Sequence, residues 1–220
     1  IVSFTESRRN PQAQLRIRGG RGGETLTLID GIPVNNIVFG GPALEITNMA
    51  IQQIDFQKGG FEPQYGNALS GVFDMRFRTG NPATREHTIQ VGLLGIEGAS
   101  EGPFRLGAPA TYLFNYRYST LGLLMPLLPT DAGTTYQDVA FKLAFPTRRA
   151  GRFEVWGMGG LDGQRLVENR DSTAWASAFW DRTRFRLVLG VGTGGLTHHV
   201  TIGRKTYVRT SAALTLQHTA

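Results

Sequence analysis

The sequence contains no cysteine and no apolar run long enough to form a membrane-spanning helix. The absence of cysteine excludes disulfide frameworks, thiolate metal sites and cysteine nucleophiles. A spanning helix needs roughly 18 consecutive apolar residues, whereas the longest apolar stretch, Leu121 to Leu128, is broken by Gly122 and Pro126. A membrane protein built from helices is therefore excluded.

Blocks of like charge are also missing, although the net charge is +6 and the isoelectric point is about 10.1. One segment, Arg18 to Gly23, has the Arg-Gly-Gly character of tails that bind single-stranded nucleic acid. It occurs once and lies between two apolar segments, which favours a glycine-rich turn between strands. We therefore expect no nucleic-acid partner.

The two ends of the sequence carry no processing signals. The chain begins at Ile1 without an initiator methionine or a signal peptide, and it ends at Ala220 within an alternating pattern. We therefore expect a piece of a longer protein, whose targeting signal cannot be read from this sequence.

Residues 1–81 contain short elements with turns at almost every junction. The pattern predicts a helical turn over Ala43 to Met49 and a tight turn at Asp30-Gly31. It predicts strands over Gln14 to Arg18, Thr25 to Ile29, Ile51 to Lys58 and Val72 to Arg78. We interpret residues 1–81 as a small mixed α/β domain.

Residues 82–220 contain about six longer segments of alternating character. Tyr112, Phe114, Tyr116 and Tyr118, for example, alternate with polar or smaller residues. The predicted strands cover His87 to Glu97, Thr111 to Ser119, Tyr136 to Phe145, Arg152 to Leu161, Phe185 to Gly192 and Tyr207 to Gln217. The fold class expected for the chain is therefore mainly β.

Two architectures share this alternation. In a soluble sandwich the apolar face packs inward, whereas in an outer-membrane barrel it faces lipid and the polar face lines the lumen. Strands of about 9 to 11 residues match a tilted crossing of the bilayer, and aromatic residues lie near the strand ends. Short links at 145–153 and 198–205 alternate with longer ones at 122–135 and 162–182. These features favour the barrel, and a soluble β-sandwich adhesin or carbohydrate-binding module stays the alternative.

Motifs for chemistry are weak. Gly190 to Gly195 fits G-x-G-x-x-G, but the β-branched residues that follow it supply no helix N-terminus for a pyrophosphate. We expect these glycines to be small lumen-facing or loop positions instead. His198 and His199 are adjacent, so in a strand they point to opposite faces and do not converge on a metal. Ser70 lacks a nucleophile-elbow context. We expect no enzyme, no cofactor and no metal site.

Six short strings occur in a family's characteristic order along the first region. They are Arg16 to Gly20, Leu28 to Val34, Ala50 to Asp55, Lys58 to Phe61, Tyr65-Gly66, and Leu69 to Asp74. The region resembles the plug domain of TonB-dependent outer-membrane receptors, and specifically of the Bacteroidetes type. Leu93 to Gly95, with Glu101 to Pro103 after it, resembles the first barrel strands of that family.

The resemblance implies a barrel of about 22 strands filled by the plug, of which the chain holds the C-terminal part of the plug (1–81) and the first strands of the barrel (82–220). It also implies import of a scarce nutrient (siderophore, cobalamin, glycan or peptide) across the bacterial outer membrane. The implied partners are outer-membrane lipid, the TonB-ExbB-ExbD complex acting through a box absent from this sequence, and a surface lipoprotein.

By the same resemblance, apical plug loops contact the nutrient. The matching positions are Arg21, Glu24, Asn35, Asn36, Phe39, Gln64 and Tyr65. Glycines and charges form the turns and releasable contacts of a gate, and we assign this role to Arg16, Arg18, Gly19, Gly20, Asp30, Gly31, Lys58, Gly59 and Asp74.

Overall fold

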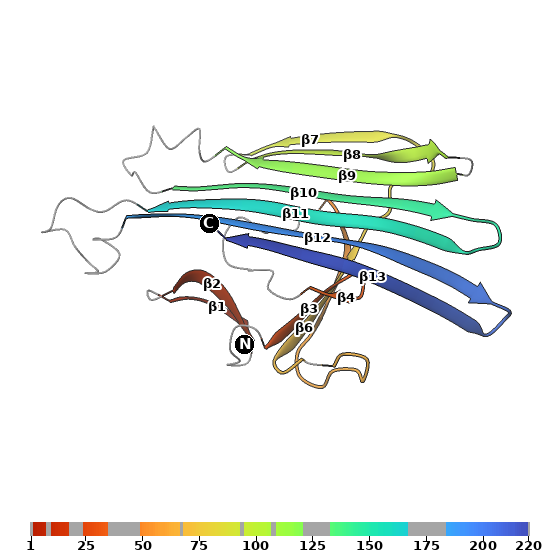
Figure 1. The fold of residues 1–220 in the computed structure, drawn as a ribbon, viewed down its shortest axis with the longest axis horizontal. Helices are drawn as coiled ribbons and strands as arrows, with labels where there is room; N and C mark the ends of the chain where they lie inside the picture. The colour runs from red at the N-terminus through yellow and green to blue at the C-terminus, as the bar shows by residue number, and fades with distance from the viewer. Residues whose placement is uncertain are drawn as a thin grey trace, which may run out of the picture.

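The computed structural model describes residues 2–7, 10–17, 24–34, 49–66, 68–92, 95–106, 109–120, 133–166 and 184–219. Every regular element in these ranges is a β-strand, and the strands form three sheets (Figure 1). The expected mainly β fold is confirmed. The helical turn predicted over Ala43 to Met49 lies almost wholly outside the described residues, so the helical part of the α/β expectation is not seen. No described segment is a helix that would be long and apolar enough to span a membrane.

The first two sheets are small. β1 (Val2–Ser7) and β2 (Asn10–Ile17) form an antiparallel hairpin. β3 (Thr25–Ile29), β4 (Ile32–Pro33), β5 (Ile51–Gln57) and β6 (Gly71–Phe77) form a four-stranded sheet in the order β4-β3-β6-β5. The strands predicted from the sequence at these positions are confirmed to within a few residues, whereas β1 and β4 were not predicted.

The third sheet has seven antiparallel strands, each paired with its neighbours in the sequence. They are β7 (Glu86–Val91), β8 (Gly95–Arg105), β9 (Pro109–Ser119), β10 (Gly133–Pro146), β11 (Arg152–Leu166), β12 (Phe185–Ile202) and β13 (Thr206–Thr219). The single strand predicted over His87 to Glu97 is wrong, because Gly92 N–H donates to Gly95 O (2.9 Å) and reverses the chain there.

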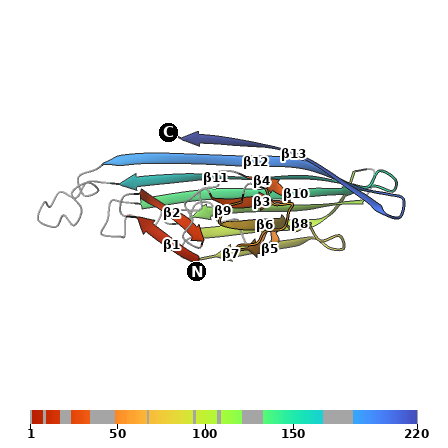
Figure 2. The same ribbon diagram turned by 90° about the horizontal axis from the view of Figure 1, so that it is seen from below.

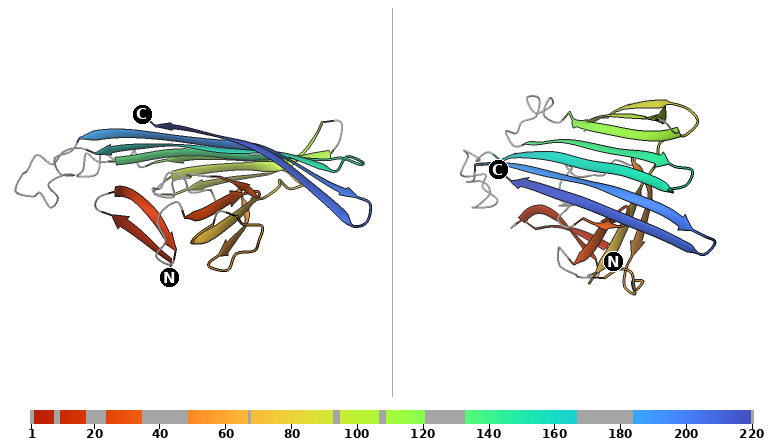
Figure 3. Two further views of the ribbon diagram at one scale, coloured as in Figure 1. Left: turned by 60° about the horizontal axis from the view of Figure 1, so that its bottom comes forward. Right: turned by 45° about the vertical axis from the view of Figure 1, so that its right-hand side comes forward.

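The seven-stranded sheet, here called the wall, is a curved layer, and both small sheets lie on one side of it (Figures 2 and 3). The strands β3 and β6 approach the wall with the ends that carry the Asp30-Gly31 turn and Phe77. The side that faces the small sheets is the inner face of the wall.

Side-chain alternation gives the wall two different faces. On β10, Ala140, Lys142 and Ala144 are buried on the inner face, which the small sheets cover. On β9, the outward-pointing Phe114, Tyr116 and Tyr118 are 40–49% exposed. The predicted separation of an apolar face from a polar or small face is therefore observed on these strands, and the apolar face points away from the rest of the chain.

The glycines of β12 depart from the prediction. Gly190 lies on the outer face, since a Cβ there would meet the Leu161 side chain at 3.0 Å, and Gly192 and Gly194 share that face. The expectation that they are lumen-facing or loop positions is therefore wrong for these three. Gly195 does face inward, where a Cβ would lie 2.7 Å from the Trp156 ring.

The apolar core is shared between the four-stranded sheet and the wall. Phe77, at the end of β6, packs edge-on against Trp156 of β11 with ring centroids 6.0 Å apart. The remaining buried members of this cluster come from both sides: Ile29, Val34, Ala50 and Met75 from the first region, and Leu113 and Ala140 from the wall. Burial of apolar surface therefore holds the small sheet against the inner face.

Candidate functional site

The turn that joins β3 to β4 inserts a carboxylate into the interface with the wall. Asp30 (φ 48°) and Gly31 (φ 74°) both adopt left-handed backbone conformations, as a tight two-residue turn requires. The Asp30 N–H donates to Met75 O (2.8 Å), and the Asp30 carboxylate accepts from Phe77 N–H (3.2 Å). Hydrogen bonds to β6 thus fix the position of the carboxylate at the side of the small sheet that faces the wall.

Lys142 of β10 receives this carboxylate. Its Nζ lies 2.9 Å from Asp30 Oδ2, 3.1 Å from Glu154 Oε2 on β11, and 3.3 Å from Phe77 O. The three side chains are only 5–8% exposed. One cation therefore bridges a carboxylate of the small sheet and a carboxylate of the wall, and all three of its N–H donors have an acceptor.

Glu154 carries the network further along the inner face. Arg152 Nε lies 2.8 Å from Glu154 Oε1, and His199 Nε2 on β12 lies 3.6 Å from Glu154 Oε2. His199 Nδ1 in turn contacts the Tyr207 hydroxyl. His198, as predicted for adjacent residues of a strand, points to the opposite face, where it stacks on Phe153.

A second cation contacts the same turn from the far edge of the wall. The Arg209 guanidinium on β13 donates to the backbone oxygen of Asp30. A Cβ built on Gly31 would lie 2.8 Å from Arg209 Nη1. Glycine is therefore required at position 31 both for the positive φ and for the close approach of Arg209.

Two further polar contacts join the first region to the wall. Arg78, just after β6, donates to Met49 O (2.8 Å) and forms an ion pair with Glu101 on β8 (2.5 Å). Asn115 Nδ2 of β9 lies 3.9 Å from Met49 Sδ and donates to Glu97 (2.8 Å). The interface thus combines apolar packing with charged contacts on β8, β10, β11 and β13.

The buried charges of this interface stabilise one another. Desolvation offsets much of the attraction in a buried ion pair, whereas removing one partner leaves an uncompensated charge at a high cost. The contacts are therefore strong only while every partner is in place.

The sequence-predicted gate residues are placed unevenly. Asp30 and Gly31 contact the wall as described above, and Asp74 is buried on β6 beside Arg76 (3.7 Å). Lys58 and Gly59 are exposed in the turn after β5. Arg16 lies on β2, paired with Ser3 in the backbone register. Arg18, Gly19 and Gly20 lie outside the described residues.

The predicted nutrient contacts fall partly in the described chain. Gln64 and Tyr65 lie in the loop between β5 and β6, where Gln64 donates to Glu62 (2.7 Å). Glu24 accepts backbone hydrogen bonds from Leu69 (3.0 Å) and Ser70 (3.1 Å) at the start of β6. Arg21, Asn35, Asn36 and Phe39 lie outside the described residues. Of the three described positions, the structure places Tyr65 next to Asp74, whose carboxylate accepts its hydroxyl hydrogen bond (3.3 Å).

Tyr65 gives a direct test of this loop. Burial and the neighbouring Asp74 carboxylate, which accepts the phenol hydrogen bond at 3.3 Å, raise its pKa above the usual value of 10.0. The folded state therefore favours the protonated phenol, so its contribution to stability is present below pH 10 and is lost as the pH rises through the folded-state pKa. In a spectrophotometric titration, Asp74→Asn is expected to lower this pKa, and Tyr65→Phe to remove this raised phenol ionisation. An unchanged titration in Asp74→Asn would contradict the contact.

Three residues of the interface were missed from sequence. Lys142, Glu154 and Arg209 lie in the predicted strands Tyr136 to Phe145, Arg152 to Leu161 and Tyr207 to Gln217, but the sequence assigns them no role. The only sign of them in the sequence is that charged residues lie at alternate positions of neighbouring predicted strands. Side chains placed in this way can meet on one face of the sheet. Alternation does not reveal that Asp30, 112 residues before Lys142, is the partner.

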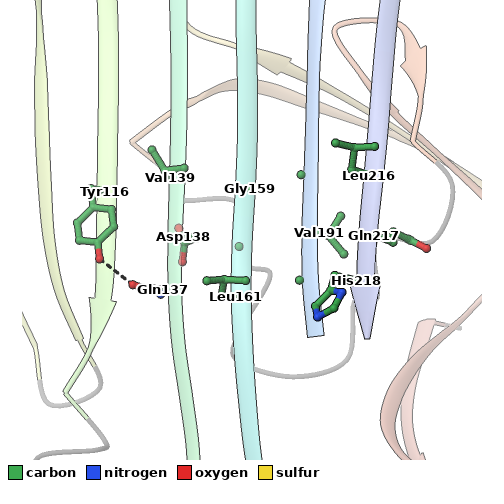
Figure 4. A pocket seen from close by; sticks show the side chains of 13 residues that line it. Tyr116, Gln137, Asp138, Val139, Gly159, Leu161, Val191, Leu216, Gln217 and His218 are labelled. Carbon is green, nitrogen blue, oxygen red and sulfur yellow. Dashed lines mark hydrogen bonds between the residues drawn. The ribbon is translucent and has the colours of Figure 1, made fainter. Parts of the chain in front are cut away.

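A shallow apolar groove of about 430 Å³ lies on the outer face of the wall, away from the small sheets (Figure 4). Its floor is bare backbone at Gly159, Gly190 and Gly192, and its sides are Val139 and Leu161. No charged side chain of the network described above lines it. Because it lies outside the wall, this groove is not part of a path through the lumen.

Comparison with protein families places the first region. Residues 1–72 match the TonB-dependent Receptor Plug Domain. This part of the chain is a TonB-dependent receptor plug domain. The two small sheets therefore belong mainly to the plug, and the seven-stranded antiparallel wall on which they pack is consistent with part of an incomplete β-barrel. No curated protein sequence matches the chain.

The plug match also supports a broad class of activity. The matched domain is that of TonB-dependent receptors, which transport their ligands across the outer membrane. Residues 1–72 therefore support outer-membrane transport in general, and the charged interface described above joins this region to the wall.

Proposed function

We propose that the chain is the later part of the plug (1–81) and the first wall strands (82–220) of a receptor of the Bacteroidetes type. This receptor imports a scarce nutrient through the plugged barrel, energised by TonB. The observation that carries the proposal is the Asp30–Lys142–Glu154 contact, which ties the plug to the inner face of the wall. The nutrient is a siderophore, cobalamin, a glycan or a peptide.

The arrangement of the two wall faces supports this function over the soluble β-sandwich. In a sandwich, a second sheet covers the apolar face. Here the small sheets cover the face that carries Lys142 and Glu154 beside a few apolar side chains such as Trp156, while Phe114, Tyr116 and Leu214 on the other face are 40–67% exposed. An exposed apolar face opposite a polar, occupied face is the arrangement expected of an outer-membrane barrel.

The residues proposed for each role are those that the resemblance to receptor plugs assigns. Glu24, Gln64 and Tyr65, together with Arg21, Asn35, Asn36 and Phe39, contact the nutrient. Asp30, Gly31 and Asp74, with the glycines and basic residues assigned above, form the gate. TonB, working with ExbB and ExbD, moves the plug, and a surface lipoprotein presents the nutrient from outside.

Uptake is expected to depend on the proton gradient and on TonB. The intact receptor would be expressed in outer membranes and screened for binding to labelled ferric siderophore, cobalamin, oligosaccharide and peptide. Accumulation of the bound compound should fall to background with a protonophore or without TonB, while surface binding is kept. Equal accumulation under all conditions would show that the import mechanism is wrong.

A further inference from the structure

Basic side chains gather at one end of the wall. Because the strands are antiparallel, the turn after β8, the β10–β11 turn and the β12–β13 turn lie at the same end of the sheet (Figure 1). They carry Arg105, Arg148, Arg149, Arg204 and Lys205, all of which are exposed.

Acidic residues do not neutralise these turns. The segments 104–109, 146–152 and 202–206 contain no Asp or Glu. Glu86, at the start of β7, lies at the same end, but it accepts a hydrogen bond from Asn81 (2.5 Å) and follows Arg85. Among the residues that the structure describes, no carboxylate lies within ion-pair distance of the five basic side chains. The electrostatic potential around these turns is therefore positive.

Aromatic side chains on the outer face lie immediately beside these cations. Phe104 precedes Arg105 and packs edge-on against Tyr112 (6.2 Å) and Phe145 (5.8 Å). Phe153, four residues after Arg149, stacks on His198 with ring centroids 4.2 Å apart. Aromatic belts mark the depth at which hydrocarbon meets the headgroups of a bilayer. Arg105, Arg148 and Arg149 lie one to four residues beyond Phe104, Phe145 and Phe153, and Arg204 and Lys205 lie in the neighbouring turn at the same end. In a bilayer, cations just beyond an aromatic belt lie level with the lipid phosphates.

We propose that this basic end of the wall, Arg105, Arg148, Arg149, Arg204 and Lys205, binds the headgroups of anionic phospholipids. Short turns of such barrels face the periplasm, so the lipids are those of the periplasmic leaflet. Guanidinium groups bind phosphate oxygens in bidentate fashion, and the adjacent aromatic belt fixes their height. The site holds this edge of the barrel at a defined depth. It depends on the wall lying in a membrane and not on which nutrient is imported.

The test uses the intact receptor purified in a neutral detergent and titrated with phosphatidylglycerol or phosphatidylcholine, with bound lipids counted by native mass spectrometry. Wild-type receptor should retain phosphatidylglycerol in preference to phosphatidylcholine. Each cation removed should weaken retention about fivefold. The variant R148Q/R149Q/R204Q should therefore lose about 100-fold, and R148K/R149K/R204K, which keeps the charge, should lose far less.

Controls separate this site from general charge effects. Lys58→Gln with Arg76→Gln removes two exposed plug cations away from the membrane and should leave lipid retention unchanged. Inorganic phosphate at the same phosphate concentration should not displace the lipid, because it lacks the chain that the aromatic belt anchors. Equal retention of both lipids by the wild type, unchanged retention in the glutamine variant, or displacement by inorganic phosphate would each overturn the proposal. Failure of nutrient uptake would leave these readouts unaffected.

Discussion

Replacing Lys142 with methionine is expected to weaken the packing of the plug on the wall by about 3–5 kcal/mol. The substitution leaves Asp30 and Glu154 buried and close together without the cation that bridges them. Methionine keeps most of the side-chain volume, so the loss reports on charge and not on a cavity. Arg152 still pairs with Glu154, which places the larger part of the loss at Asp30.

The measurement is the urea concentration at which a protease first cleaves the plug in the intact, membrane-inserted receptor, since cleavage follows the population of the opened form. Gln52→Met, at an exposed position of the plug on β5, should change the free energy of plug opening by less than about 0.5 kcal/mol. A shift for Lys142→Met as small as that of the control would contradict the contact.

A double variant isolates the pair itself. Asp30→Asn combined with Lys142→Met removes both charges that face each other across the interface, so the combined loss should be smaller than the sum of the single losses. Simple additivity of the two losses would show that Asp30 and Lys142 do not interact.

Trp156→Ala is expected to destabilise the same interface by about 3–5 kcal/mol, the usual cost of truncating a fully buried aromatic side chain. Trp156 is 1% exposed and lies between Phe77 of the plug and Gly195 of the neighbouring strand. Its removal opens a cavity between plug and wall, and the strands around it are too regular to collapse into the space.

Leu161→Ala is the matched control for Trp156. Leu161 lies on the same strand but points to the outer face, where it is 47% exposed. It should shift plug protection by less than about 1 kcal/mol, because little apolar area is buried there to lose. Equal effects of the two substitutions would mean that the shared core does not hold the plug.

Much of the wall was predictable from the sequence. On β9 and β10, aromatic and apolar residues alternate with smaller or polar ones, and the period of two assigns each residue to a face. The same period places Phe141 and Lys142 of β10 on opposite faces, and in the structure Lys142 faces the plug while Phe141 lies over Gly157 of β11 on the other face. The turn at Asp30-Gly31 was predictable as well, because few residue pairs tolerate a positive φ at both positions.

The parts that failed have physical reasons. Gly92 to Gly95 reverses the chain inside an apolar stretch, where periodicity continues across the turn and hides it. Glycine has no side chain whose polarity could assign it to a face of the sheet. The sequence therefore does not show which face Gly190, Gly192 and Gly194 occupy. Alternation also fixes orientation but not partners across long separations, so the contact between Asp30 and Lys142 is visible only in the structure.

During transport the plug is expected to leave this face of the wall. The most direct test uses the intact receptor, with any cysteine outside the present sequence replaced, and introduces Met49→Cys with Asn115→Cys, whose native side chains approach to 3.9 Å across the interface. A short, cleavable bifunctional thiol reagent then links plug to wall without touching Lys142. Uptake of the compound identified by the binding screen should stop on linking and return on cleavage, while either single-cysteine variant is unaffected. Undiminished uptake by fully linked receptor would contradict the claim.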